Sequence, residues 1–316
     1  MDRRARQDLK ARQDGNTDPE PMAKASDFHP EVLGLFDKYV HGIIDRRGFL
    51  AGAGKFAVGG MSAAALLEAL SPRFAQAQKV PRDDPRLQAE TVAFDSPDGY
   101  GKASGYLVRP ANATGKLLPG VLVVHENRGL NPHIEDVARR LALENFVAFA
   151  PDALFPFGGY PGDEDKAREL FAKLEQPKTR EDFVAAAKLL QKHEGVNGRI
   201  GVVGFCWGGG IANLLAARLP ELRAAAPYYG PAPAAAQVAN IKARMLIHYA
   251  GNDERINAGW PAYEAALKEA GVRYEAFIYP DTQHGFHNDT TPRYDEAAAK
   301  QSWERTLALF NDALRG

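Results

Sequence analysis

The chain has 316 residues, of which 45% are hydrophobic and 25% charged, and its formal net charge at pH 7 is -1. A chain of this length can bury a full hydrophobic core without disulfides or structural metals. The near-neutral charge excludes a general electrostatic attraction to nucleic acid. Cys206 is the single cysteine, so no disulfide can form within the chain.

The first 77 residues differ in composition from the rest of the chain. Residues 1–27 are polar, charged and poor in aromatic side chains, which predicts a disordered tail. Residues 28–77 begin with apolar side chains at helical spacing between Val32 and Val40. We expect the main domain to occupy residues 78–316.

Residues 28–77 carry features of a bacterial export signal. Arg46 and Arg47 are followed by a weakly apolar run and then by a small-residue pattern that ends at Ala77. This order resembles a twin-arginine signal. Cleavage after Ala77 would leave a mature chain beginning at Gln78, and the pattern favours a periplasmic or exported protein.

A second interpretation keeps the segment attached, as a helical extension that packs on the domain of a cytoplasmic protein. Asp45 replaces the usual Ser or Thr of an export signal, and Lys55 and Glu68 interrupt the apolar run. These charges also make the run too short to span a membrane.

From about residue 88, apolar strands alternate with helices. The segments at 90–94 and 104–110 predict an initial hairpin. Further strands are predicted at 120–126, 146–152, 199–205, 224–230, 243–251 and 274–280. Helices are predicted at 134–145, 163–174, 179–193, 207–219, 259–271 and from about Tyr294. This alternation predicts an α/β fold with a mostly parallel central sheet covered by helices on both faces.

The strongest chemical signal surrounds Cys206, which lies between a predicted strand and a predicted helix. Glycines stand two positions before and two positions after it, at Gly204 and Gly208. A nucleophile on a strained strand-to-helix turn needs this spacing, because the backbone is crowded there. The helix N-terminus that follows favours a thiolate. The alternative is a buried structural cysteine.

Two further residues follow in the order that a catalytic triad on this type of sheet requires. Asp253 and His284 each come shortly after a predicted strand, where open α/β sheets place their sites. We expect His284 to act as general base and then as general acid, with Asp253 orienting its ring. The alternatives are a capped loop histidine, and Asp281 or Asp295 as the acid.

From about residue 90 onwards the chain resembles the dienelactone hydrolase family, also called carboxymethylenebutenolidases, within the α/β-hydrolase superfamily. The resemblance rests on "VVHENRGLNPHIEDVARRLA", "APD", "GFCWGGG" and "HGFHND". It is closest to bacterial members that have an N-terminal extension. It implies a cofactor-free hydrolase that acts on a small ester or lactone through Cys206.

The resemblance also implies two roles near the nucleophile. Glu126, after a buried strand, would contact the thiol and tune its protonation. The alternative for Glu126 is a structural ion pair with Arg128 or Arg139. The backbone amides of Trp207 and Asn127 would form the oxyanion hole.

The expected substrate pocket departs from the family pattern. Members that open dienelactone hold its carboxylate with two arginines, whereas here the first loop has no early arginine and Asn288 stands near the second position. Arg128 or Arg293 are the candidates to replace them. An aromatic pocket wall is suggested by Phe155, Phe157, Tyr160 and Trp207, with core packing an equal alternative.

No metal or cofactor is expected. His125 and His287 invite a metal interpretation with His284, but Gly285 interrupts the helical face that such spacing would need. The alternative function is a non-catalytic small-molecule-binding or thiol-sensing protein on the same fold. The expected partner is a small ester or lactone, without nucleic acid or a stable membrane span, and a homodimer is left open.

Overall fold

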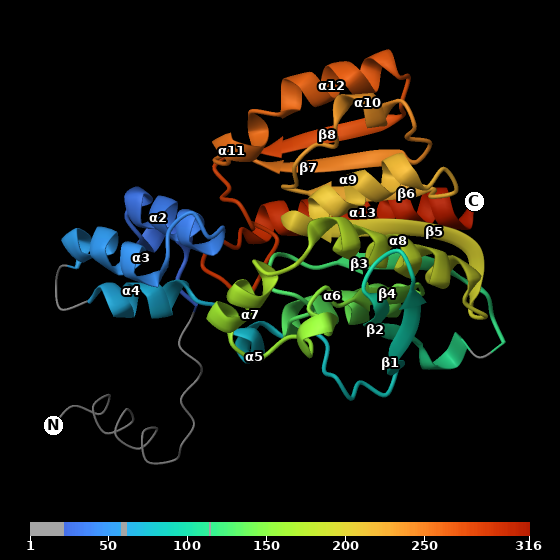
Figure 1. The fold of residues 1–316 in the computed structure, drawn as a ribbon, viewed down its shortest axis with the longest axis horizontal. Coiled ribbons are helices and arrows are strands. Elements are labelled where there is room, and N and C mark those ends of the chain that lie inside the picture. The colour runs from blue at the N-terminus through green and yellow to red at the C-terminus, as the bar shows by residue number, and fades with distance from the viewer. Residues whose placement is uncertain (1–21, 58–61, 114) are drawn as a thin grey trace, which may run out of the picture.

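The computed structural model describes residues 22–57, 62–113 and 115–316. Most of the predicted tail therefore lies outside the described residues. Its last part contains a short 3₁₀ helix, η1 (Ala25–Asp27). Figure 1 shows a group of N-terminal helices beside a larger domain built on one sheet.

The sheet has eight strands in the order β1-β2-β4-β3-β5-β6-β7-β8. Strands β1 and β2 form the predicted hairpin, and β2 also pairs antiparallel with β4, while the other neighbours are parallel. The predicted mostly parallel α/β-hydrolase architecture is confirmed. The strands are β1 (Leu87–Ser96), β2 (Gly101–Pro110), β3 (Leu118–Val124), β4 (Val147–Pro151), β5 (Val196–Phe205), β6 (Ala224–Tyr228), β7 (Arg244–Ala250) and β8 (Tyr274–Tyr279).

Helices cover both faces of the sheet because the central strands are buried and apolar on both sides. One face packs against α6 (Pro132–Leu143) and α13 (Glu296–Arg315). The other packs against α8 (Gln176–Lys192), α9 (Trp207–Arg218) and α12 (Trp260–Glu269). The shorter helices are α5 (Phe74–Ala77), η3 (Ala111–Ala113), η4 (Phe155–Phe157), α7 (Glu164–Phe171), α10 (Ala235–Val238) and α11 (Glu254–Asn257).

The N-terminal extension, by which we mean residues 22–77, has a small hydrophobic core of its own. Besides η1 and α5, its described helices are α2 (Pro30–Val40), α3 (Arg46–Ala53), η2 (Gly54–Phe56) and α4 (Ala63–Leu70). The core residues are Val32, Leu33, Phe36, Tyr39, Phe49, Ala53, Leu66, Leu67 and Leu70. Helix α3 begins at the paired arginines because the Asp45 carboxylate accepts a hydrogen bond from the Gly48 amide at 2.7 Å.

The C-terminal end of α2 contacts the main domain through its last carbonyl groups. The Val40 carbonyl accepts hydrogen bonds from Asn127 at 2.9 Å and Arg128 at 3.1 Å, and Arg168 donates to the Tyr39 carbonyl at 3.0 Å. The last carbonyls of a helix lack partners within the helix and carry partial negative charge, so arginines suit this end.

The extension lies beside α7, on the side of the molecule toward which β7 and β8 point (Figure 1). The carboxyl ends of parallel strands are where open α/β sheets place their sites. Among residues 22–57, 62–113 and 115–316, no helix has the length and apolar character needed to cross a membrane.

Candidate active site

Cys206 occupies a strained turn between β5 and α9. Its backbone has a φ of 56° and a ψ of -116°, which is costly for a residue with a side chain. A Cβ on Gly204 would lie 2.0 Å from the Gly208 carbonyl oxygen, and one on Gly208 would lie 2.4 Å from the Val124 carbonyl oxygen. The two glycines are therefore required by close backbone contact, as the sequence pattern predicted.

His284 and Asp253 meet beside this turn. Nδ1 of His284 lies 2.5 Å from Oδ2 of Asp253, and both side chains are buried. Asp253 is itself fixed at the start of α11, where it accepts a hydrogen bond from the Ile256 amide at 3.3 Å. The carboxylate holds the ring so that Nε2 of His284 is free to act on the thiol.

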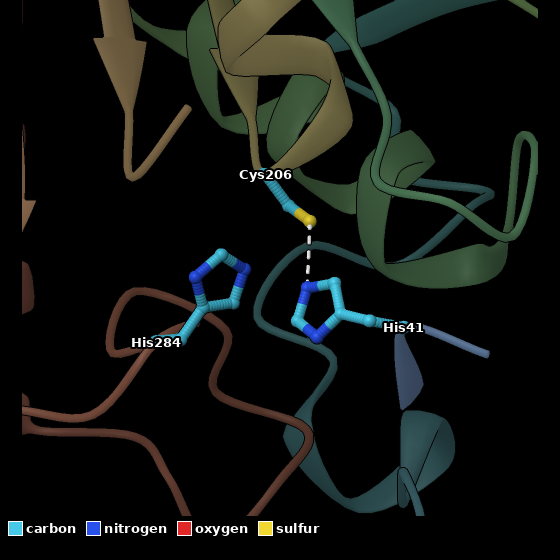
Figure 2. A group of neighbouring side chains, drawn as sticks. All are labelled: His41, Cys206 and His284. Carbon is cyan, nitrogen blue, oxygen red and sulfur yellow. Dashed lines mark hydrogen bonds between the residues drawn. The ribbon is translucent and has the colours of Figure 1, made fainter. Parts of the chain in front are cut away.

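A second imidazole contacts the thiol, and sequence reasoning missed it. Nε2 of His41 lies 3.6 Å from Sγ of Cys206. Nδ1 of His41 lies 2.8 Å from the Asp37 carbonyl oxygen and 3.2 Å from its Oδ1. Figure 2 shows the thiol directed toward the His41 ring, with the His284 ring to one side. No motif surrounds His41 that could have identified it.

The thiol and the two imidazoles shift one another's ionisation. Burial opposes a thiolate, but His284 and His41 outweigh it and lower the pKa of Cys206 to about 6. Burial disfavours a charged imidazole, but Cys206 and Asp253 raise the pKa of His284 to about 10. Burial acts the same way on His41, and Asp37 and Cys206 together raise its pKa. Near neutral pH the arrangement favours a thiolate beside an imidazolium.

A pocket of about 390 Å³ opens at the thiol, which is large enough for a small organic substrate. Its lining comes from the extension, from α7, from the turn that carries Cys206, and from the segments after β3, β6, β7 and β8. The lining residues are His41, Gly42, Asn127, Arg168, Phe171, Ala172, Cys206, Trp207, Tyr229, Pro231, Arg255, Ile256 and His284.

A family model described as the dienelactone hydrolase family matches residues 103–314. The chain belongs to the dienelactone hydrolase family. A second model, described as YqhI-like, matches residues 20–57, which lie largely in the extension.

Relatives of known name support this membership. The chain is 35% identical over 220 residues to a "putative carboxymethylenebutenolidase" of Salmonella typhi, covering 65% of this chain and 81% of that one. It is 33% identical over 247 residues to a "probable 2-oxo-3-(5-oxofuran-2-ylidene)propanoate lactonase" of Bradyrhizobium, covering 73% and 98%.

A solved structure also supports membership of this family. The crystal structure of a "putative dienelactone hydrolase" from Klebsiella pneumoniae aligns with a TM-score of 0.62 at 31% identity, covering 71% of this chain and 98% of that one. The protein is thus a dienelactone hydrolase-like enzyme, a hydrolase of carboxylic esters of the carboxymethylenebutenolidase type.

Within this dienelactone hydrolase-like site, Glu126 has a hydrogen-bond partner that was not predicted, and its role at the thiol stays a prediction. Its Oε2 accepts a hydrogen bond from Asn288 at 2.9 Å. The Cys206 thiol forms its hydrogen bond with His41. The structural ion pairs form elsewhere, because Arg128 lies 3.7 Å from Glu164 and Arg139 lies 3.6 Å from Asp136.

The predicted pocket residues divide into two groups. Trp207 and Asn127 line the pocket at the thiol, as their predicted position next to the nucleophile requires. Arg128, Phe155, Phe157 and Tyr160 are outside that lining. Arg128 is buried against the Val40 carbonyl, the two phenylalanines are exposed on η4, and the Tyr160 hydroxyl donates to Glu164 at 2.9 Å. The aromatic side chains at the pocket are instead Phe171, Trp207 and Tyr229.

The side chains at the thiol are also types that zinc binds. The ligand atoms of His41, Cys206 and His284 lie within 4.8 Å of one another. However, the Arg255 guanidinium lies 3.0 Å from Nε2 of His41 and would repel a cation there. His125, which suggested a metal from sequence, accepts a hydrogen bond from the Ala153 amide at 3.1 Å, and His287 stacks on Phe205. The arrangement fits an activated nucleophile better than a metal centre.

Proposed function

We propose that the enzyme hydrolyses a small ester or lactone through a thioester on Cys206, with His284 and Asp253 completing the triad. The observation that carries the proposal is the position of the Cys206 thiol on its strained turn. Its sulfur lies within 4.8 Å of a ring nitrogen of His284, which is paired with Asp253, and it lines an open pocket. A buried thiol with a pKa lowered to about 6 is a nucleophile at neutral pH.

The proposed reaction has two halves. The Cys206 thiolate attacks the carbonyl carbon, the bond to the alkoxy oxygen breaks, and His284 gives its proton to that oxygen. Water then attacks the thioester and loses a proton to an imidazole. The carbon–sulfur bond breaks, the electron pair returns to sulfur as thiolate, and the carboxylic acid leaves. A lactone follows the same path, but its alcohol and acid remain in one product.

The backbone amides of Trp207 and Asn127 are proposed to hold the developing oxyanion. Trp207 is the first residue of α9, and the first amides of a helix have no partner within the helix. Asn127 follows β3 and lies at the same pocket. Glu126 is proposed to act on the site indirectly, through its bond to Asn288.

The pocket favours a substrate that carries a negative charge. Among the described residues its lining has two arginines, Arg168 and Arg255, and no carboxylate. Arginine binds carboxylates in a forked geometry. A small lactone or ester with a carboxylate substituent therefore suits the site, and a relative named as a lactonase of a propanoate agrees with this.

The test is turnover of p-nitrophenyl acetate and a panel of small lactones by the wild-type enzyme and by Cys206→Ala and His284→Ala. We expect wild-type turnover and a loss of at least about a thousandfold in both variants, since removing a triad member leaves only binding and the oxyanion hole. Unchanged turnover in Cys206→Ala, with the protein folded, would contradict the proposal.

A further inference from the structure

The extension brings a complete imidazole–carboxylate pair to the reactive sulfur. His41 follows the end of α2, one turn beyond Asp37, and both belong to a segment that precedes the hydrolase domain. The pair gives the thiol a second imidazole held by an aspartate, as His284 is held by Asp253, and Figure 2 shows the two rings near the sulfur. Nothing in the triad requires it, because one imidazole suffices to activate a cysteine.

The position of His41 is held by the docking of α2. Asn127 and Arg128 bind the Val40 carbonyl, directly before His41 in the chain. Arg293 lies 3.7 Å from Asp37 and also stacks over the Phe36 ring. Only 12% of the His41 side chain is exposed. A side chain that is held by fixed contacts of its own and of the residues before it can serve catalysis.

We propose that His41, oriented by Asp37, is a second acid–base residue of the Cys206 thiol, so that the extension is a working part of the active site. This inference rests on the proposed function of Cys206 as nucleophile. His41 is a catalytic residue in this account because it contacts the reacting sulfur, and Asp37 is a positioning residue.

The protonation pattern around His41 is consistent with this role. Nδ1 donates to the Asp37 carbonyl oxygen, which leaves the Nε2 lone pair facing the thiol and the Arg255 guanidinium. When the thiol proton moves to Nε2, sulfur becomes thiolate, and exposed Arg255 can turn away into solvent. The charged and titratable groups that face His41 are Asp37, Cys206, Arg255 and His284, with Arg168 across the pocket.

With two imidazoles, each can serve one half of the reaction. Before acylation the proton shared with the thiol passes to His284, which gives it to the leaving oxygen, so His41 is neutral in the thioester. His41 then takes a proton from the water that attacks the thioester carbon, the carbon–sulfur bond breaks, and the thiolate re-forms beside a protonated His41. The carboxylic acid product leaves, and the proton on His41 passes by way of the Cys206 sulfur to His284, which restores the starting state.

The test uses the full-length protein and the rate at which iodoacetamide alkylates Cys206, the single cysteine, across pH. In His41→Gln we expect alkylation at pH 6 to slow about fivefold and alkylation at pH 9 to be unchanged, because the thiol is ionised in both proteins at high pH. Asp37→Asn should move the profile in the same direction by less. The acid limb of the pH profile of kcat/KM for an ester should shift to higher pH together with the alkylation profile.

His29→Gln is the matched control, because it makes the same change in the extension away from the thiol. His29 caps α2 and stacks on Phe56 at 4.5 Å between ring centroids. We expect its alkylation profile to match the wild type. The proposal is overturned if His41→Gln and Asp37→Asn, both folded, alkylate at pH 6 within twofold of wild type. Failure of the proposed function appears differently, as a wild type that alkylates readily but does not turn over esters.

Discussion

At the scale of single residues, the site combines groups that sequence could identify with groups that only folding brings together. Cys206 could be predicted because close backbone contacts at its turn require glycine at Gly204 and Gly208, and this spacing is visible in the sequence. Asp253 and His284 could be predicted because strand ends place them. His41 could not, because it meets Cys206 across 165 positions and only through the docking of α2. Phe155 and Phe157, predicted for the pocket wall, are exposed on η4 and outside the lining of the pocket at the thiol.

Arg255 gives a residue-scale prediction about substrate charge. It lines the pocket and is exposed, so its replacement leaves no buried group without a partner. In Arg255→Gln we expect the KM for a carboxylate-bearing lactone to rise about 5- to 20-fold, which corresponds to the loss of one charge-assisted hydrogen bond. A neutral lactone of the same ring size is the control for any effect through His41. An equal change for both lactones would contradict an anion-binding role.

At the scale of elements, the strands were predictable and the helix boundaries less so. Strands that are buried on both faces consist of continuous runs of apolar residues, and such runs are visible in the sequence. Helix α7 begins at Glu164 because the Asp163 carboxylate accepts the Lys166 amide at 2.8 Å. Helix α13 begins at Glu296, two residues after the predicted start, because Asp295 caps it in the same way. Side-chain capping decides such boundaries, and apolar periodicity does not report it.

Helix α3 gives an element-scale prediction that concerns the paired arginines. Its N-terminal amides are satisfied by Asp45. Asp45→Ala should destabilise this helix by about 1 kcal/mol, whereas Asp45→Ser should retain most of the stability, because serine also caps helices. Hydrogen exchange of the α3 amides in the full-length protein measures this. Equal exchange in Asp45→Ala and wild type would show that the cap contributes nothing to the extension.

At the scale of the whole molecule, the hydrolase domain was predicted, and an extension that packs on it was one of two interpretations of the sequence. Alternating strands and helices predicted the sheet, its cover on both faces and the edge at which the site lies. The contact between α2 and the domain includes dispersed polar groups on Asn127, Arg128, Arg168 and Asp165, and it has no sequence pattern. It makes the active site a product of both parts of the chain.

The central claim is that Cys206 carries the acyl group during turnover. The most direct measurement is to mix the full-length enzyme with p-nitrophenyl acetate, quench with acid within the first turnovers and locate the acetyl group by peptide mass spectrometry. We expect the added acetyl mass on the peptide that contains Cys206. An acetyl group on another residue, or turnover by a Cys206→Ala protein, would contradict the account.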